Sequence, residues 1–193
     1  MRRLAIVVFV LLGLGVPARA RAQAVPAARD GAGLEHGRTL ELSGLFFAEA
    51  WDFNGRPGAA LVGGTASVAL PVHGRWAAVL EGLAINIDER RRNTLVGGVS
   101  ILVRRQIAEC GATTVFLEGG AGVSYASQPV PAGGTRFNYP LQAGGGVARR
   151  FGPHVGGLLS LRLFHLSNKS LDGPSRNPDI EALGGHVGIF ISF

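Results

Sequence analysis

Residues 180–193 read IEALGGHVGIFISF, a stretch in which apolar residues alternate with small or polar ones. Five apolar residues share one parity: Leu183, Val187, Ile189, Ile191 and Phe193. His186 and Ser192 have the opposite parity. Successive side chains of a strand point to opposite faces, so this alternation predicts a β-strand with one apolar and one more polar face.

Seven segments upstream have the same character, and turn residues separate them. The eight predicted strands span residues 39–53, 60–72, 76–88, 94–108, 113–127, 137–151, 155–168 and 180–193. Four connections are long (54–59, 89–93, 128–136 and 169–179), and the three between them are short (73–75, 109–112 and 152–154). Outer-membrane barrels pair short periplasmic turns with longer external loops. We therefore expect an all-β fold, an eight-stranded antiparallel up-and-down transmembrane β-barrel that forms a single domain over residues 39–193.

The two faces of these strands predict where the barrel meets lipid. We expect the apolar parity to face lipid and the polar parity to face a small lumen. In 155–168 three leucines oppose Arg162, although Phe164 and Leu166 interrupt the polar face. An apolar final strand ending on Phe193 is typical of proteins folded by the outer-membrane assembly machinery, which is an expected partner. A soluble two-sheet sandwich is the alternative fold.

The first 24 residues have a different composition from the rest. Arg2 and Arg3 precede an apolar run over residues 4–16, and Ala22-Gln23-Ala24 supplies a small-x-small cleavage pattern. This predicts a signal peptide, residues 1–24, whose removal leaves a flexible lead-in over 25–38. Export then places the protein in the outer membrane of a Gram-negative cell. After residue 24 no apolar run approaches the roughly 18 residues of a membrane helix.

Charge and cysteine content exclude several classes. The formal charge is +6, and losing the four arginines of the signal peptide lowers it to roughly +2. The high basicity therefore comes partly from the signal peptide, and we expect no nucleic-acid partner. Cys110 is the only cysteine, so the chain can form no internal disulfide, and its place beside a turn indicates a structural role.

The chemistry is concentrated in residues 165–181. His165 and Ser167 are two apart on a strand, so they share a face, and their parity is that of the leucines expected to meet lipid. Glu181 has the lipid-facing parity on the adjacent strand. A serine becomes a nucleophile when an imidazole takes its proton, and a carboxylate orients that imidazole. The set predicts ester hydrolysis at the external rim, with Asp179 as the rival acid.

At these residues the chain resembles the lipid A 3-O-deacylase (PagL), or outer-membrane acyloxyacyl hydrolase-like, family. The resemblance rests on His165-Leu166-Ser167-Asn168, with Asn177 and Glu181 downstream, and covers about 30 residues. Arg162 and Leu171 also fit the pattern. The resemblance implies an eight-stranded outer-membrane barrel that releases a 3-hydroxyacyl chain from lipid A without a cofactor. It implies Ser167 as nucleophile, His165 as base and Glu181 as orienting acid.

The resemblance also implies an oxyanion hole from the Asn177 side chain and a backbone N–H near Ser170, with Asn168 as the other candidate amide. Two departures bear on this assignment. Ser170 stands where the family often has glycine, and the stretch between Asn168 and Asn177 is about two residues longer.

The other histidines and the loop cations are the remaining residues that could bind a ligand. His36, His73, His154 and His186 have no carboxylate or thiol at metal-ligand spacing, so no metal site is expected. The cations of the predicted loops are candidates for binding the phosphates of lipid A. These are Arg90, Arg91, Arg92, Lys169 and Arg176.

Two other functions compete with the esterase. One is a non-catalytic structural or binding barrel of the OmpA or OmpX type, and the other is a narrow pore for apolar solutes. Neither gives a role to His165, Ser167 and Glu181, and eight strands leave little room for an aqueous channel. A homodimer is compatible with the sequence, which leaves acyl position, chain length and oligomeric state open.

Overall fold

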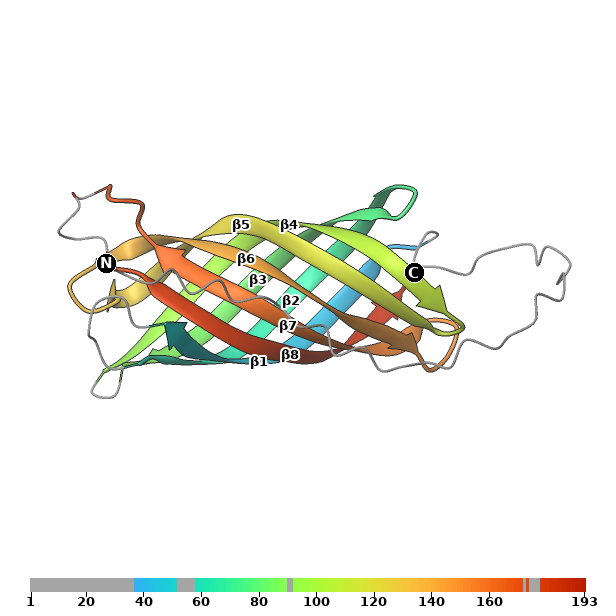
Figure 1. Cartoon of the computed structure of the whole chain (residues 1–193), viewed down its shortest axis with the longest axis horizontal. Coiled ribbons are helices and arrows are strands. Elements are labelled where there is room, and N and C mark those ends of the chain that lie inside the picture. The colour runs from blue at the N-terminus through green and yellow to red at the C-terminus, as the bar shows by residue number, and fades with distance from the viewer. Residues whose placement is uncertain (1–36, 52–57, 90–91, 172, 174–177) are drawn as a thin grey trace, which may run out of the picture. The chain divides into compact units, whose positions relative to one another are not determined.

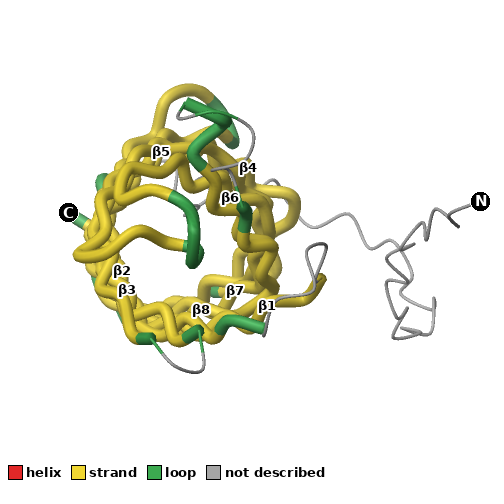
Figure 2. Tube along the Cα trace, turned by 90° about the vertical axis from the view of Figure 1, so that its left-hand side faces the viewer, coloured by secondary structure: helices red, strands yellow, loops and turns green. Residues whose placement is uncertain are grey.

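The computed structural model describes residues 37–51, 58–89, 92–171, 173 and 178–193. Eight strands close into an antiparallel barrel in which each strand pairs with its sequence neighbour and β1 pairs with β8 (Figures 1 and 2). Their bounds are β1 Thr39–Trp51, β2 Ala60–His73, β3 Trp76–Asp88, β4 Asn93–Cys110, β5 Thr113–Val130, β6 Thr135–Arg150, β7 Val155–Ser167 and β8 Ile180–Ser192. The expected eight-stranded up-and-down barrel is confirmed.

The barrel has a loop end and a short-turn end. β2–β3, β4–β5 and β6–β7 are joined at the short-turn end, where Arg38 and Phe193 exchange backbone hydrogen bonds of 3.0 and 2.9 Å. The predicted signal peptide and residues 25–36 of the lead-in lie outside the described part of the chain. No described helix is long and apolar enough to cross a bilayer.

The β5–β6 connection is shorter than predicted. Residues 128–136 were expected to be a loop, but β5 continues to Val130 and β6 begins at Thr135. The β5–β6 pairing shifts register between Tyr125 and Val130, and an irregular pairing of this kind tolerates Pro129, which lacks an N–H. Val130 is fully buried in the apolar cluster at this end, which explains why the strand continues.

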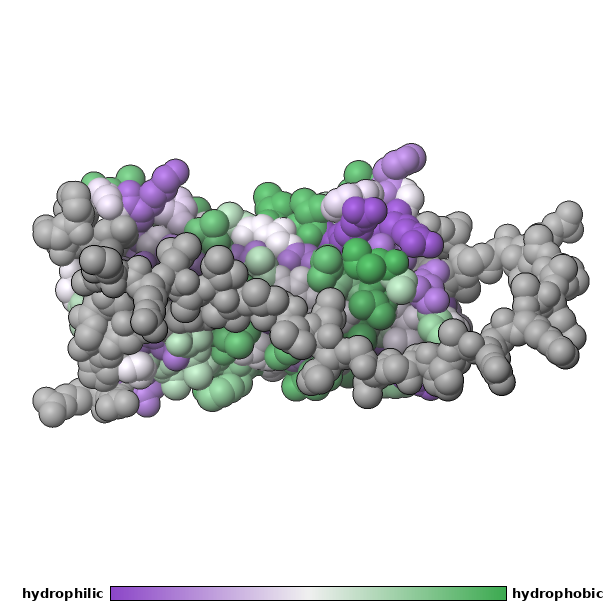
Figure 3. All heavy atoms as spheres, viewed as in Figure 1, coloured by the Kyte–Doolittle hydropathy of each residue, from purple (hydrophilic) through white to green (hydrophobic). Residues whose placement is uncertain are grey.

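The outer surface is apolar along the middle of the barrel, as a lipid-facing surface must be. Large side chains stand exposed there, including Ile101 and Val187 at 66% and Leu161 at 64%. Figure 3 shows hydrophobic side chains along the visible face and hydrophilic side chains gathered toward the ends.

The lower lumen, toward the short-turn end, is filled by an ionic cluster. The Nε of Arg104 donates to Glu118 at 2.9 Å, and Arg104 also pairs with Glu41. Arg162 Nη1 donates to Glu81 at 2.7 Å, and its Nε donates to Glu118 at 2.8 Å. All five side chains are at most 6% exposed. Buried charges are stable only when they are paired in this way. Through Arg162, the cluster links β7 to β3 and β5 across the lumen.

The upper lumen, toward the loop end, is apolar, which differs from the polar lumen expected from parity. Phe164 and Leu166 point inward and are 3% and 0% exposed. They belong to a cluster contributed by most strands of the barrel, with Phe47 5.4 Å from Phe164 between ring centroids. The two apparent interruptions of the polar face of β7 are therefore core residues. With the ionic layer below and the apolar layer above, the lumen is packed with side chains, which argues against the pore hypothesis.

Candidate active site

The side chains of His165, Ser167 and Glu181 form a continuous chain of hydrogen bonds. His165 on β7 lies directly opposite Glu181 on β8, and the Nδ1 of its ring is 2.6 Å from Glu181 Oε1. The other ring nitrogen, Nε2, is 2.8 Å from Ser167 Oγ. Strand geometry explains the arrangement, because residues two apart share a face and directly paired residues have neighbouring side chains.

The three side chains lie on the outer face, as their parity predicted. The His165 and Glu181 side chains are each 30% exposed, and Ser167, the last residue of β7, is 8% exposed. His165 pairs with Leu141 and follows Leu163, whose side chains are 48% and 37% exposed on the same surface. The site thus borders the apolar outer surface and does not open into the lumen.

A tight turn follows Ser167. The backbone N–H of Leu171 donates to the Asn168 carbonyl at 3.2 Å, and the two central residues, Lys169 and Ser170, have φ of 54° and 59°. Two successive positive φ angles define a type I′ turn, which favours glycine and asparagine over lysine and serine. The chain therefore adopts an unfavourable backbone conformation at Lys169 and Ser170, in the turn that follows Ser167.

Asn168 holds this turn through both ends of its amide. Its Oδ1 accepts the Ser170 N–H at 2.9 Å, and its Nδ2 donates to Thr135 Oγ1 on β6 at 3.0 Å. Asn168 is 1% exposed. In this conformation the Ser170 N–H is already bonded, and the Asn168 amide braces the turn against the β5–β6 hairpin. Asn177, the other oxyanion candidate, lies outside the described residues.

A groove of ≈ 490 Å³ runs along the outer surface beside His165 and Glu181. Small residues of β5 and β6 line it, with Gly119 paired to Ala143 and Ala121 paired to Leu141. The Leu141 and Leu163 side chains also line it. Strand parity predicted that Leu141 and Leu163 face lipid. It did not predict the groove, because the depth of the groove depends on which small residues of β5 and β6 become neighbours.

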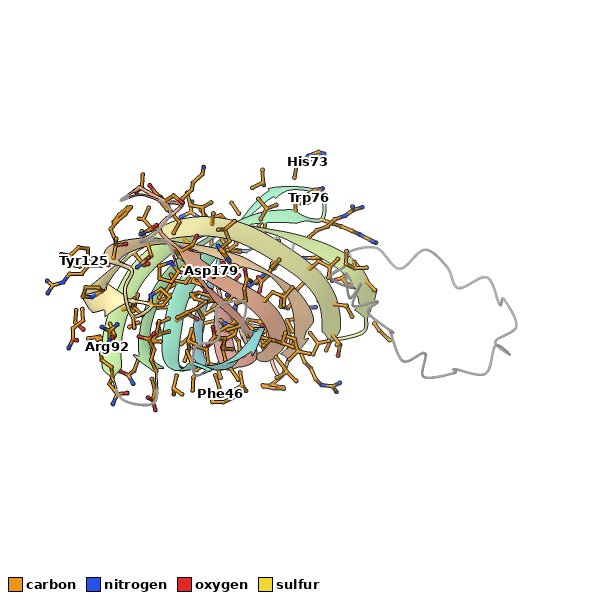
Figure 4. All side chains as sticks on the ribbon, turned by 60° about the vertical axis from the view of Figure 1, so that its left-hand side comes forward. Phe46, His73, Trp76, Arg92, Tyr125 and Asp179 are labelled. Atoms are coloured by element: carbon orange, nitrogen blue, oxygen red, sulfur yellow. The ribbon has the colours of Figure 1, made fainter. Side chains whose placement is uncertain are left out.

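Asp179 also lies close to the hydrogen-bonded set. Ligand atoms of His165, Asp179 and Glu181 fall within 4.8 Å of one another, and no other such group of three is found in the part of the chain that the structure describes. Two of these three side chains are bonded to each other. Asp179 lies at the loop end with Tyr125 and Arg92, whereas His73 and Trp76 lie toward the short-turn end (Figure 4).

The loop cations have different environments. Arg92 Nη2 is paired with Glu89 at 3.0 Å and also donates to the Pro129 carbonyl. Glu89 accepts the Ala132 N–H at 2.9 Å, so this pair ties the β3–β4 loop to the β5–β6 turn. Lys169 is exposed. The remaining phosphate candidates, Arg90, Arg91 and Arg176, fall outside the described residues.

Comparison with known families adds a decisive observation. The family model for the lipid A 3-O-deacylase (PagL) matches residues 46–190, which is most of the chain and includes all three side chains of the hydrogen-bonded set. The chain belongs to the PagL family. Outer-membrane localisation follows for this PagL-family barrel, and the resemblance seen around His165 and Ser167 extends over nearly all of its strands. No match was found among curated proteins.

Solved structures agree on the fold of this PagL-family chain. Neisserial surface protein A (NspA) has a TM-score of 0.56 at 10% identity, with 81% of this chain and 96% of that chain covered. The outer-membrane enzyme PagL has a TM-score of 0.52 at 14% identity, covering 78% and 97%. OprG from Pseudomonas aeruginosa gives 0.54 at 9% identity, covering 81% and 96%. At these identities the three structures support the barrel alone.

Proposed function

We propose that this protein is an outer-membrane esterase that removes an ester-linked 3-hydroxyacyl chain from lipid A, with Ser167 as nucleophile, His165 as general base and Glu181 as orienting acid. The observation that carries the proposal is the pair of contacts made by one imidazole, 2.6 Å to Glu181 and 2.8 Å to Ser167. A nucleophile, a base and an orienting acid in hydrogen-bond contact are the arrangement that acyl transfer requires.

The reaction proceeds in two halves. Ser167 Oγ attacks the ester carbonyl carbon while His165 Nε2 accepts the hydroxyl proton, giving a tetrahedral intermediate. The C–O bond to the sugar breaks, and the imidazolium returns its proton to the departing sugar oxygen. Water then attacks the acyl-serine with His165 again as base, which releases the fatty acid and restores Ser167. Glu181 stabilises the imidazolium in both halves.

The surroundings of the site support a lipid substrate. The groove lined by Gly119, Ala121 and Ala143 adjoins His165 and Glu181 on the surface that meets lipid, so an acyl chain of a membrane lipid can lie along it. The PagL family supplies the substrate class, lipid A. A water-soluble ester has no need of an active site on the outside of a barrel.

Two further expectations belong to this proposal. Residues 1–24 act as a cleaved signal peptide, and the apolar C-terminal strand ending at Phe193 directs assembly into the outer membrane. The loop cations Arg90, Arg91, Lys169 and Arg176 contact lipid A phosphates. Arg92 contributes less to this binding, because its guanidinium is held by Glu89.

The test is mass spectrometry of lipid A from cells that produce the wild-type protein or Ser167→Ala. Loss of one 3-hydroxyacyl chain with the wild type, and unchanged lipid A with the variant, is the expected result. Unchanged lipid A in both, with folded barrel in the outer membrane, would favour the non-catalytic OmpA- or OmpX-type function.

A further inference from the structure

At the short-turn end, the apolar outer surface gives way to arginine and tryptophan. Along the middle of β3 and β4, paired outward residues are apolar, and Leu80 and Ile101 stand 56% and 66% exposed. The next outward pair toward the short-turn end is Ala78 with Val103, and the one after it is Trp76 with Arg105. Since acyl chains cover the apolar pairs, Trp76 and Arg105 lie at the height where lipid headgroups begin.

Arg75, Trp76 and Arg105 form a local cluster, here named the Arg–Trp patch. The guanidinium carbon of Arg105 lies 5.1 Å from the centre of the Trp76 ring, a cation–π contact. Arg75 Nη1 donates to the Ile107 carbonyl at 3.4 Å, and the Arg75 carbonyl accepts the Gln106 N–H at 2.9 Å. The two guanidinium groups are exposed. The β2–β3 turn thus presents two cations beside an exposed aromatic ring.

The short-turn end is rich in arginine. Among the described residues outside the lumen, the short-turn end has five arginines (Arg38, Arg75, Arg105, Arg149 and Arg150) and one acidic side chain, Glu109. An excess of arginine at a membrane boundary favours anionic headgroups over zwitterionic ones.

We propose that the Arg–Trp patch binds the headgroup phosphate of an anionic glycerophospholipid in the periplasmic leaflet. Short turns of outer-membrane barrels lie on the periplasmic side, so the patch faces that leaflet. Arginine matches a phosphate with parallel N–H donors, and an indole ring is stable at the boundary between acyl chains and water. The site is separate from the hydrogen-bonded set around His165, and the inference does not depend on the proposed esterase activity.

Native mass spectrometry of the folded protein tests the proposal. The protein is released from micelles that contain equal amounts of phosphatidylglycerol and phosphatidylcholine with identical acyl chains. We expect the wild type to retain phosphatidylglycerol in roughly 25-fold excess, about five-fold for each arginine, and we expect Arg75→Gln/Arg105→Gln to bring the ratio close to one. Arg136→Gln, which removes an exposed cation from the loop end, is the control for the loss of positive charge and should keep the wild-type ratio.

Equal retention of the two lipids by the wild type would overturn the proposal, and so would an equal loss in the control. Heat-modifiable gel migration establishes that each variant is folded. If the double variant does not fold, the wild-type preference should still weaken as ionic strength rises, because exposed charges are screened by salt. A preference that salt leaves unchanged would equally contradict the assignment.

Discussion

His165 and Glu181 are directly paired residues of β7 and β8, with Nδ1 and Oε1 2.6 Å apart. The carboxylate accepts a hydrogen bond from the Nδ1–H group, and this favours the tautomer whose Nε2 lone pair faces Ser167. The strand register thereby favours the imidazole tautomer that a general base needs.

Ser167→Ala and His165→Ala should each lower deacylation by about 10³-fold or more, because nucleophile and base act as one unit. The assay is release of 3-hydroxy fatty acid from lipid A in mixed micelles. Both variants should show the heat-modifiable gel migration of a folded barrel, since neither side chain packs in the lumen. A folded Ser167→Ala that retains full activity would end the esterase hypothesis.

Glu181→Gln should lower activity by roughly 10²-fold, a milder effect, because the imidazole remains a base but loses the charge that stabilises its protonated form. Asp179→Asn is the matched control for the neighbouring carboxylate and should change activity by only a few-fold. If the two effects were reversed, Asp179 would be the orienting acid.

Ser170→Gly should raise the free energy of unfolding by up to about 1 kcal/mol, because glycine adopts a positive φ without steric cost. Asn168→Ala should act in the opposite direction, since it removes the acceptor of the Ser170 N–H and the donor to Thr135 Oγ1. Urea titration in detergent micelles measures both. Equal stabilities of Ser170→Gly and the wild type would show that the turn is not strained.

Ala143→Leu should fill the groove beside His165 and lower the hydrolysis of lipid A by about 10-fold, while a short-chain soluble ester is hydrolysed at the wild-type rate. Losing a well-oriented acyl chain costs transition-state binding that the short ester never uses. Ala84→Leu makes the same substitution on β3, outside the lining of this groove, and should leave both rates unchanged. Parallel loss on both esters would point to a distorted site.

Arg162→Ala should destabilise the barrel by about 3–5 kcal/mol, because it removes the partner of Glu81 and one of the two arginines bonded to Glu118. Arg136→Ala, which removes an exposed arginine at the loop end, is the control and should have a small effect. The measurement is the urea midpoint of folded protein on heat-modifiable gels.

The strands and the location of the site were predictable because both follow from parity. Leu161, Leu163 and His165 share one face whatever the details of the fold, and the PagL-like residues indicated what His165 and Ser167 could do. The alternating connection lengths likewise predict that Ser167 lies at the loop end.

Features that depend on contacts across the barrel were not predictable. Phe164 and Leu166 seemed misplaced by parity, because nothing in β7 alone indicates that Phe47 and its neighbours make the upper lumen apolar. The continuation of β5 past Pro129 required knowing that Val130 finds a buried site. The bond from Asn168 to Thr135 joins residues 33 apart in the sequence, beyond the reach of local spacing.

The packed lumen leaves the outer wall as the place where a substrate can meet the groove. Molecules then arrive by lateral diffusion within the bilayer plane, so encounter rates scale with the number of lipid molecules per unit area. Diluting the substrate lipid with inert lipid should slow hydrolysis even when the bulk concentration of substrate is constant. Diluting the whole suspension with buffer should not slow it. The concentration that sets the reaction rate is therefore the mole fraction of substrate lipid in the membrane.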